Sequence, residues 1–194
     1  MLSEEAWENL CLHDKNISLY LAPMKTASIQ ELKQELQETS QPKLLDLCLR
    51  LAKFKKENKE LLTYLLFEAH DEEAYIISVK MIIDEGFAEL PKANIYLTKK
   101  SLRKILRITN KYIKYTGSKQ AEVALLIYFC GKMKERIANI QRSTALHNVY
   151  LQQIKKINVS LKVLHEDLQY DFRRDLDGLV LEEGSVLSKI FGKR

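Results

Sequence analysis

The feature that most constrains this 194-residue sequence is a succession of amphipathic segments bounded by helix-capping residues. The segment "SIQE" (residues 28–31) is a capping-box pattern, in which the serine hydroxyl accepts from a backbone N–H and the glutamate reaches back. Pro42 suits the first turn of a helix, Asp71 and Ser118 are typical N-cap residues, and Gly117 is typical of a helix end. This punctuation predicts helices joined by short turns.

The composition supports the same fold class. Only six Gly and three Pro are present, and strong helix formers dominate a chain that is 46% hydrophobic and 29% charged. We therefore expect an all-α protein, an irregular array or bundle of about six or seven antiparallel-connected helices, with the longer helices in the C-terminal half. We expect helices over residues 28–39, 42–54, 61–69, 72–86, 98–116, 119–141 and 143–172.

Several local boundaries follow from the same patterns. The polar run "KKENKE" (55–60) predicts a turn, Gly86 a helix end, and residues 87–97 a longer connection. Thr98 is the predicted N-cap of the helix over 98–116. The segment "DLDGLVLEE" (175–183) lacks two of the acidic ligands of a calcium loop, so it predicts a helix-ending turn.

The two ends of the chain differ in character from its middle. Residues 1–23 contain the single Trp and precede the helical pattern, so they predict an N-terminal appendage. Residues 24–177 are expected to form a single helical domain. Residues 178–194 end in "VLSKIFGKR", which indicates a C-terminal amphipathic tail.

Two segments carry a resemblance to known proteins. "LLDLCLRLAKFKKENKELLTYLLFEAHDEE" and "KYTGSKQAEVALLIYFCGKM" resemble a group of uncharacterised bacterial all-helical proteins of unknown function. The resemblance covers roughly residues 24–175. It implies a helical fold and a bacterial source, and it brings no catalytic residue.

The sequence lacks the motifs of several common chemistries. Neither "TGSK" nor "CGKM" has the spacing of a phosphate-binding loop, and no histidine stands in an Glu-x-x-His or HExxH pattern. Cys48 and Cys130 lie in apolar runs that predict core positions, where a thiol is a poor nucleophile. We therefore expect a non-enzymatic protein without catalytic residues, cofactor or metal.

The compartment is predicted from the ends and the cysteines. Three widely spaced cysteines argue against a disulfide framework, and the acidic start "MLSEEAWENL" is unlike a signal peptide. No apolar run reaches the length of about 20 residues that spans a bilayer. These features predict a cytoplasmic protein with no membrane span.

The most informative local feature is a basic segment. Between Glu89 and Glu122 the chain has nine Lys and Arg and no acid. At 100° per residue, the cations of the predicted helix fall within an arc of about 140°, opposite its apolar residues. These candidate contacts for an anion or partner are Lys99, Lys100, Arg103, Lys104, Arg107, Lys111 and Lys114.

Three interpretations of this arc stay open at the level of sequence. It can be a solvated face or one paired internally with acids such as Glu72, Glu73 or Asp171, it can bind nucleic acid, or it can bind another acidic partner. Tyr112 and Tyr115 fall toward the apolar side, so packing is expected rather than base stacking. The sequence favours a non-catalytic helical interaction or scaffold protein with an unidentified protein partner or self-association. The alternative is a nucleic-acid-binding protein that uses residues 98–116.

Overall fold

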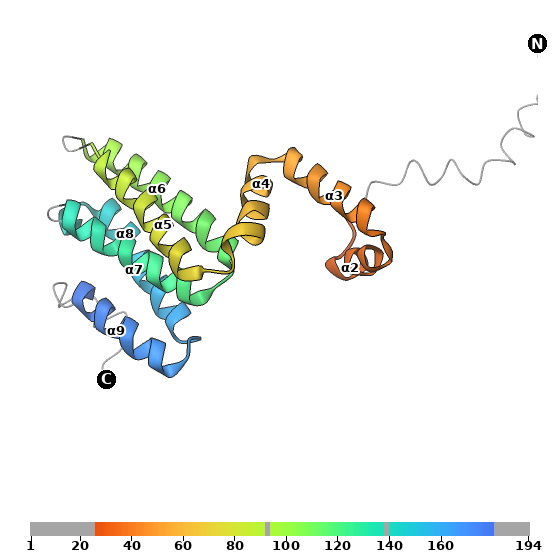
Figure 1. Ribbon diagram of the computed structural model, residues 1–194. Coiled ribbons are helices and arrows are strands. Elements are labelled where there is room, and N and C mark those ends of the chain that lie inside the picture. Colours follow the sequence, from red (N-terminus) through yellow and green to blue (C-terminus); the bar gives the residue numbers. More distant parts are fainter. Residues whose placement is uncertain (1–25, 92–93, 138–139, 181–194) are drawn as a thin grey trace, which may run out of the picture. The chain divides into compact units, whose positions relative to one another are not determined.

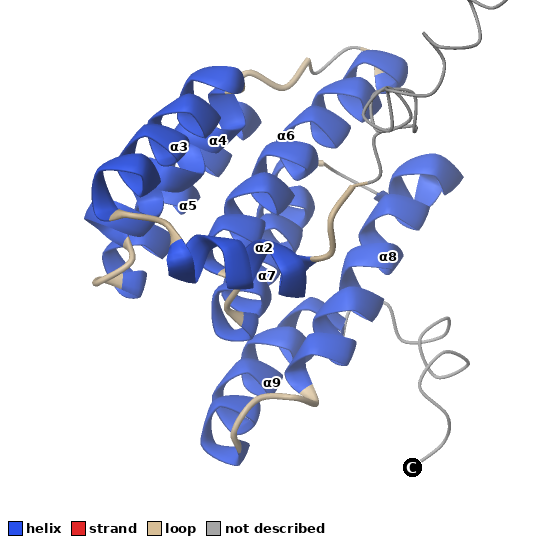
Figure 2. Cartoon of the chain, turned by 90° about the vertical axis from the view of Figure 1, so that its right-hand side faces the viewer, coloured by secondary structure: helices blue, strands red, loops and turns tan. Residues whose placement is uncertain are grey.

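The computed structural model describes residues 26–91, 94–137 and 140–180, and within these ranges it contains eight α-helices and no strand (Figures 1 and 2). The all-α fold class is confirmed. The chain divides into two compact units, Met1–Phe54 and Lys55–Arg194. This division falls inside the range 24–177, and the domain boundaries drawn from sequence stay a prediction. The predicted appendage over 1–23 and residues 181–194 of the predicted tail lie outside the described residues.

The described part of the first unit consists of α2 (Ile29–Glu38) and α3 (Gln41–Phe54). The capping box is confirmed, because the Glu31 N–H donates to Ser28 Oγ over 3.3 Å and the Ser28 N–H donates to Glu31 Oε2 over 2.7 Å. Neither helix buries a residue. The predicted core position of Cys48 is therefore wrong, since its side chain is exposed on α3.

The second unit holds the remaining helices. In chain order they are α4 (Lys56–Thr63), the π-helical turn η2 (Tyr64–Glu68), α5 (Glu72–Ala88), α6 (Ile95–Thr116), α7 (Lys119–Arg136), the 3-10 turn η3 (Ile140–Arg142), α8 (Thr144–Leu161) and α9 (Glu166–Val180). Two predicted caps are confirmed, because the side chains of Asp71 and Ser118 accept from the N–H groups of Ala74 and Ala121. Gly117 ends α6 at a left-handed φ of 64°, which glycine adopts without strain.

Three predicted turns are helical instead. The run 55–60 belongs mostly to α4, and α9 continues through Gly178. Helix packing explains why a glycine stands at position 86, because a Cβ there would lie 2.8 Å from Ile105 Cγ1. The missing side chain lets α5 approach α6 closely, so this glycine lies within α5 and does not end it.

The helix expected over 143–172 is divided into α8 and α9. The Val163 and Leu164 N–H groups donate to the carbonyls of Ser160 and Leu161, which closes a tight turn. A straight helix of this length would run about 45 Å and carry its last apolar residues past the core. The turn instead brings α9 back onto α7 and buries Leu176. The helix expected over 119–141 likewise ends early, at Arg136.

Helix α7 is the centre of the second unit. It packs against α5, α6, α8 and α9, as Figure 1 allows the reader to follow. Being covered on several sides, it buries apolar residues around much of its circumference: Ala121, Val123, Leu125, Leu126, Phe129, Cys130 and Met133. The predicted core position of Cys130 is confirmed, and burial raises the pKa of its thiol.

One carboxylate is buried among these apolar residues. Glu122 on α7 is 6% exposed and lies 2.7 Å from Lys119 Nζ and 2.9 Å from Lys156 Nζ, while the Ser160 hydroxyl donates to it over 2.8 Å. Burial acts to raise the pKa of Glu122, but the three bonds outweigh it and lower the pKa to about 2. Lys156 also donates to Asn110 Oδ1 over 2.8 Å. This network joins α6, α7 and α8.

Candidate functional site: the basic face of helix α6

Helix α6 begins earlier than its sequence pattern predicts. Asn94 is the N-cap, and its Oδ1 accepts from the N–H groups of Tyr96 and Leu97 over 2.9 and 3.2 Å. The prediction that Thr98 caps this helix is wrong. Its hydroxyl is turned inward and donates to the Pro91 and Asn94 carbonyls over 2.7 and 2.9 Å. The earlier start adds a turn to the helix and shortens the connection expected over 87–97.

The apolar side of α6 fixes the orientation of the basic side. Leu102, Ile105, Thr109 and Ile113 are buried, and α6 packs against α5 and α7. These positions recur every three or four residues, so they lie on one side of the helix. The cations at intervening positions consequently lie on the opposite side of the helix.

Five of the predicted cations gather on this outer side with one aromatic ring. They line a shallow hollow together with Tyr96, and we call them the basic face: Lys99, Lys100, Arg103, Lys104 and Arg107. No carboxylate of the described residues lies within 4.0 Å of any of these five cationic groups. The basic face is therefore a cluster of like charge, exposed at Lys100, Arg103, Lys104 and Arg107 and half-buried at Lys99.

Tyr96 was missed by the sequence reasoning. Its side chain is 73% exposed, whereas Tyr112 and Tyr115 are partly buried against the core, as predicted. The sequence contains the information that indicates Tyr96. It precedes Lys99 by three residues, so on a continuous helix its side chain falls within the arc of the cations. It was hidden by the prediction that the helix starts at Thr98.

Lys111 does not belong to the basic face, because it is paired within the second unit. Its Nζ lies 2.6 Å from Glu60 Oε2 and 4.7 Å from the centre of the Tyr112 ring. The Tyr115 hydroxyl donates to the same carboxylate over 2.9 Å. The hydrogen bond from Lys111 holds the pKa of Glu60 below its usual range. Lys111 thus ties α6 to α4, which is a structural role.

The other expected internal pairs do not form among the described residues. Glu72 accepts from the Ser118 hydroxyl over 2.8 Å, and neither Glu73 nor Asp171 lies in an ion pair with a cation of α6. Lys114 is exposed near the end of α6, where a cation interacts favourably with the helix dipole. Among the described residues, internal pairing therefore accounts for Lys111 alone of the seven predicted cations.

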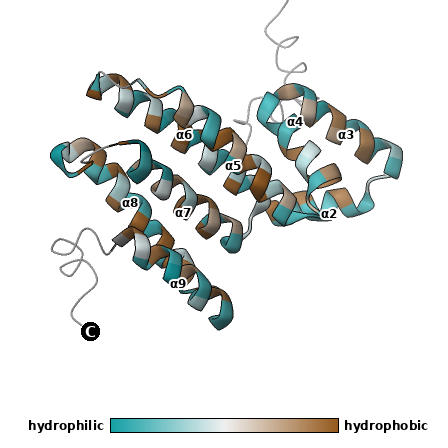
Figure 3. Ribbon diagram, turned by 60° about the vertical axis from the view of Figure 1, so that its left-hand side comes forward, coloured by the Kyte–Doolittle hydropathy of each residue, from teal (hydrophilic) through white to brown (hydrophobic). Residues whose placement is uncertain are grey.

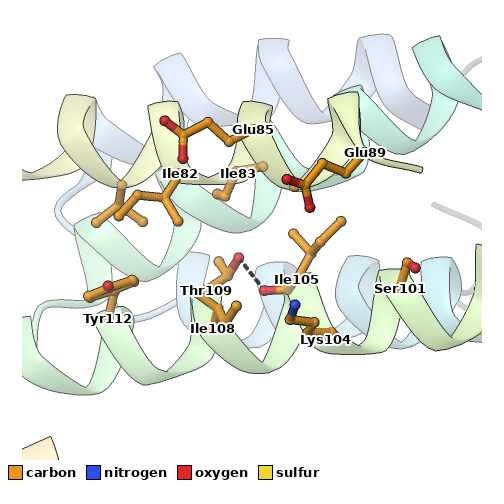
Figure 4. A pocket seen from close by; sticks show the side chains of 12 residues that line it. Ile82, Ile83, Glu85, Glu89, Ser101, Lys104, Ile105, Ile108, Thr109 and Tyr112 are labelled. Carbon is orange, nitrogen blue, oxygen red and sulfur yellow. Dashed lines mark hydrogen bonds between the residues drawn. The ribbon is translucent and has the colours of Figure 1, made fainter. Parts of the chain in front are cut away.

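A small cavity adjoins the basic face between α5 and α6. It holds about 210 Å³, and Val79, Ile83 and Ile105 contribute to its apolar lining. Figure 4 shows Glu85 and Glu89 on the α5 side and Lys104 on the α6 side. The Thr109 hydroxyl in its wall donates to the Ile105 carbonyl over 3.0 Å. The cavity is smaller than the roughly 300–1,000 Å³ of typical ligand pockets.

Among the described residues, no three His, Cys, Asp or Glu side chains are placed to hold a metal ion together. No helix in the same part of the chain has the length and apolar character needed to cross a membrane.

Comparison of the chain with protein-family models, with curated proteins and with solved structures gives no match. The resemblance to uncharacterised bacterial helical proteins stays a prediction.

Proposed function

We propose that this protein is a non-catalytic helical interaction protein that docks an acidic protein partner on the basic face of α6. The observation that carries the proposal is the cluster of five cations, four exposed and Lys99 half-buried, none of which has a carboxylate of the described residues within 4.0 Å. An opposing anionic surface would supply the missing partners.

Energetics favours a docking role over a merely solvated face. Lys99 and Arg103, Lys100 and Lys104, and Arg103 and Arg107 are each four residues apart on α6. Like charges at this spacing destabilise a helix by roughly 0.2–0.5 kcal/mol per pair. A face that serves only solubility would do so equally well with positive and negative side chains interspersed. The uniform sign costs stability, and an anionic partner would offset that cost.

The test uses a charge reversal on the basic face and a matched reversal elsewhere. Arg103→Glu with Arg107→Glu removes the centre of the basic face. Lys155→Glu with Lys162→Glu changes the net charge equally at two exposed positions of the second unit. A fluorescent Glu-rich helical peptide serves as the acidic probe, and its anisotropy is measured at low and at about 0.15 M salt.

We expect the wild type and the Lys155/Lys162 variant to bind the peptide, with weaker binding at higher salt because exposed charges are screened. The Arg103/Arg107 variant should lose at least about tenfold in affinity. Equal affinity of both variants would contradict the proposal, because binding would then follow net charge and not the basic face.

A second candidate function is the binding of single-stranded nucleic acid, and Tyr96 favours it. An exposed ring within a row of cations is the arrangement on which an unpaired base can stack while its phosphates contact Lys and Arg. A mobility-shift titration with mixed RNA and DNA at the same two salt concentrations separates the candidates. The protein-docking proposal expects no shift near physiological salt. A shift that falls steeply with salt and is lost in Tyr96→Ala would favour nucleic acid.

A further inference from the structure

We propose that the apolar surface of α3 is a self-association interface, covered by the α2 and α3 helices of a second copy of this chain. The proposal concerns the first unit and is independent of the basic face of α6. It would make the protein a symmetric dimer in which each copy supplies the same surface.

The apolar surface of α3 is wide. Projected at 100° per residue, its apolar side chains cover about 220° of the helix circumference. They are Leu44, Leu45, Leu47, Cys48, Leu49, Leu51, Ala52 and Phe54. Lys43, Asp46, Arg50 and Lys53 share the remaining sector. Helices that are apolar over more than half of their circumference are normally buried.

Helix α3 nevertheless buries none of its residues. Leu45 is 60% exposed and Phe54 is 78% exposed. Thr39 and Ser40 connect α3 to α2, but the two helices are not among the pairs that pack along each other. Figure 3 shows apolar residues along α3. Among the described residues no helix packs along α3, and a helix of this length is marginal in water without tertiary packing, so a partner surface would stabilise α3.

The charges of α2 and α3 are complementary. Helix α2 carries Glu31, Glu35 and Glu38 against Lys33, so its net charge is −2. Helix α3 carries Lys43, Arg50 and Lys53 against Asp46, so its net charge is +2. No ion pair joins the two helices within the described chain. A second copy supplies an apolar face for α3 and an acidic α2 to lie beside each basic α3, so the surface is self-complementary.

The thiol of Cys48 allows a site-specific test. Cys48 lies near the centre of the apolar sector and is exposed on α3, whereas Cys130 is fully buried in the second unit. All proteins carry Cys11→Ser, so that maleimide labelling reports on Cys48. Sedimentation velocity over a concentration series gives the oligomeric state of the full-length chain.

We expect a monomer–dimer equilibrium, with labelling of Cys48 slowing as dimer forms. Leu45→Glu should raise the dimer dissociation constant at least about tenfold and keep labelling fast at all concentrations. The matched control is Val159→Glu, the same kind of change at an α8 side chain that is 67% exposed. It should leave both measurements unchanged.

Two results would overturn the inference. A dimer whose Cys48 stays as reactive as in dilute solution would associate through another surface. A chain that is monomeric at every concentration would have no second copy on α3, whether its Cys48 reacts quickly or slowly. Circular dichroism of each variant checks that the helices of the second unit are retained.

Discussion

Helices α3 and α7 share an apolar run with one cysteine but lie in opposite environments. Cys48 on α3 is exposed, whereas Cys130 on α7 is fully buried. Four other helices cover α7, whereas α3 buries none of its residues. The comparison teaches that an apolar helical pattern indicates a face that needs to be buried, but it does not identify the surface that buries that face.

The largest expected loss of stability comes from a substitution in the buried part of α7. Phe129 on α7 is fully buried and packs with its ring centre 5.4 Å from that of Phe87. Phe129→Ala should lower the free energy of unfolding by about 3–5 kcal/mol, because it leaves a cavity in a close-packed core. Phe54→Ala on α3 should lower it by less than about 0.5 kcal/mol in dilute protein. Urea unfolding followed by circular dichroism measures both, and equal losses would contradict the contrast.

The buried carboxylate of α7 predicts an acid-dependent stability. The pKa of Glu122 is about 2 in the folded protein and near 4.5 when unfolded, so its contribution is present above pH 4.5. As the pH falls from about 4.5 to 2, protonation should remove up to about 3 kcal/mol of the free energy of unfolding.

Glu122→Gln should flatten the pH dependence of this transition in urea unfolding at several pH values. Glu31→Gln is the matched control, because that carboxylate caps α2 in the first unit. It should leave the acid-induced loss in the second unit unchanged. A wild-type transition that does not depend on pH below 4.5 would show that Glu122 is not held as a charged group.

The close approach of α5 to α6 predicts a smaller effect. Gly86→Ala places a Cβ 2.8 Å from Ile105 Cγ1, so the Ile105 side chain or the two helices must shift and the protein should lose about 1–3 kcal/mol of stability. Gly178→Ala on α9 meets no atom within 4 Å and should be neutral or stabilising by up to about 1 kcal/mol. Thermal unfolding of the two variants should therefore shift in opposite directions or by clearly different amounts.

The smallest expected losses of stability come from removing the serine N-caps of α7 and α2. Ser118→Ala removes a hydroxyl that accepts from Ala121 N–H and donates to Glu72, so it should cost roughly 1–2 kcal/mol in the second unit. Ser28→Ala removes the α2 cap. It should reduce helicity slightly without moving the main unfolding transition. A shift of that transition by Ser28→Ala would mean that the first unit unfolds together with the second.

Much of the fold follows from local sequence chemistry. The caps at Ser28, Asp71 and Ser118 depend on residues three positions apart, so the chain itself contains the information. The burial of Cys48 and the continuous helix over 143–172 were wrong for a different reason. Both depend on which helices lie alongside, and α9 turns back because α7 offers it a surface.

The candidate site shows the same limit. The arc of cations on α6 was predicted from periodicity, and the structure places those residues on one side of the helix. That Lys111 is paired while the five residues of the basic face are not depends on the position of Glu60, fifty-one residues away in the chain. The network around Glu122 also joins residues far apart in sequence, so no spacing rule indicates it.

The most direct test of the contrast between the two units is hydrogen exchange of the amides of α3 and α7 over a range of protein concentrations. We expect α7 to be strongly protected at every concentration, because a covered core exchanges only through large-scale unfolding. We expect α3 to exchange rapidly in dilute protein and to gain protection as the concentration rises, as a face covered by a second copy requires. Strong protection of α3 in the most dilute sample, equal to that of α7, would contradict the account.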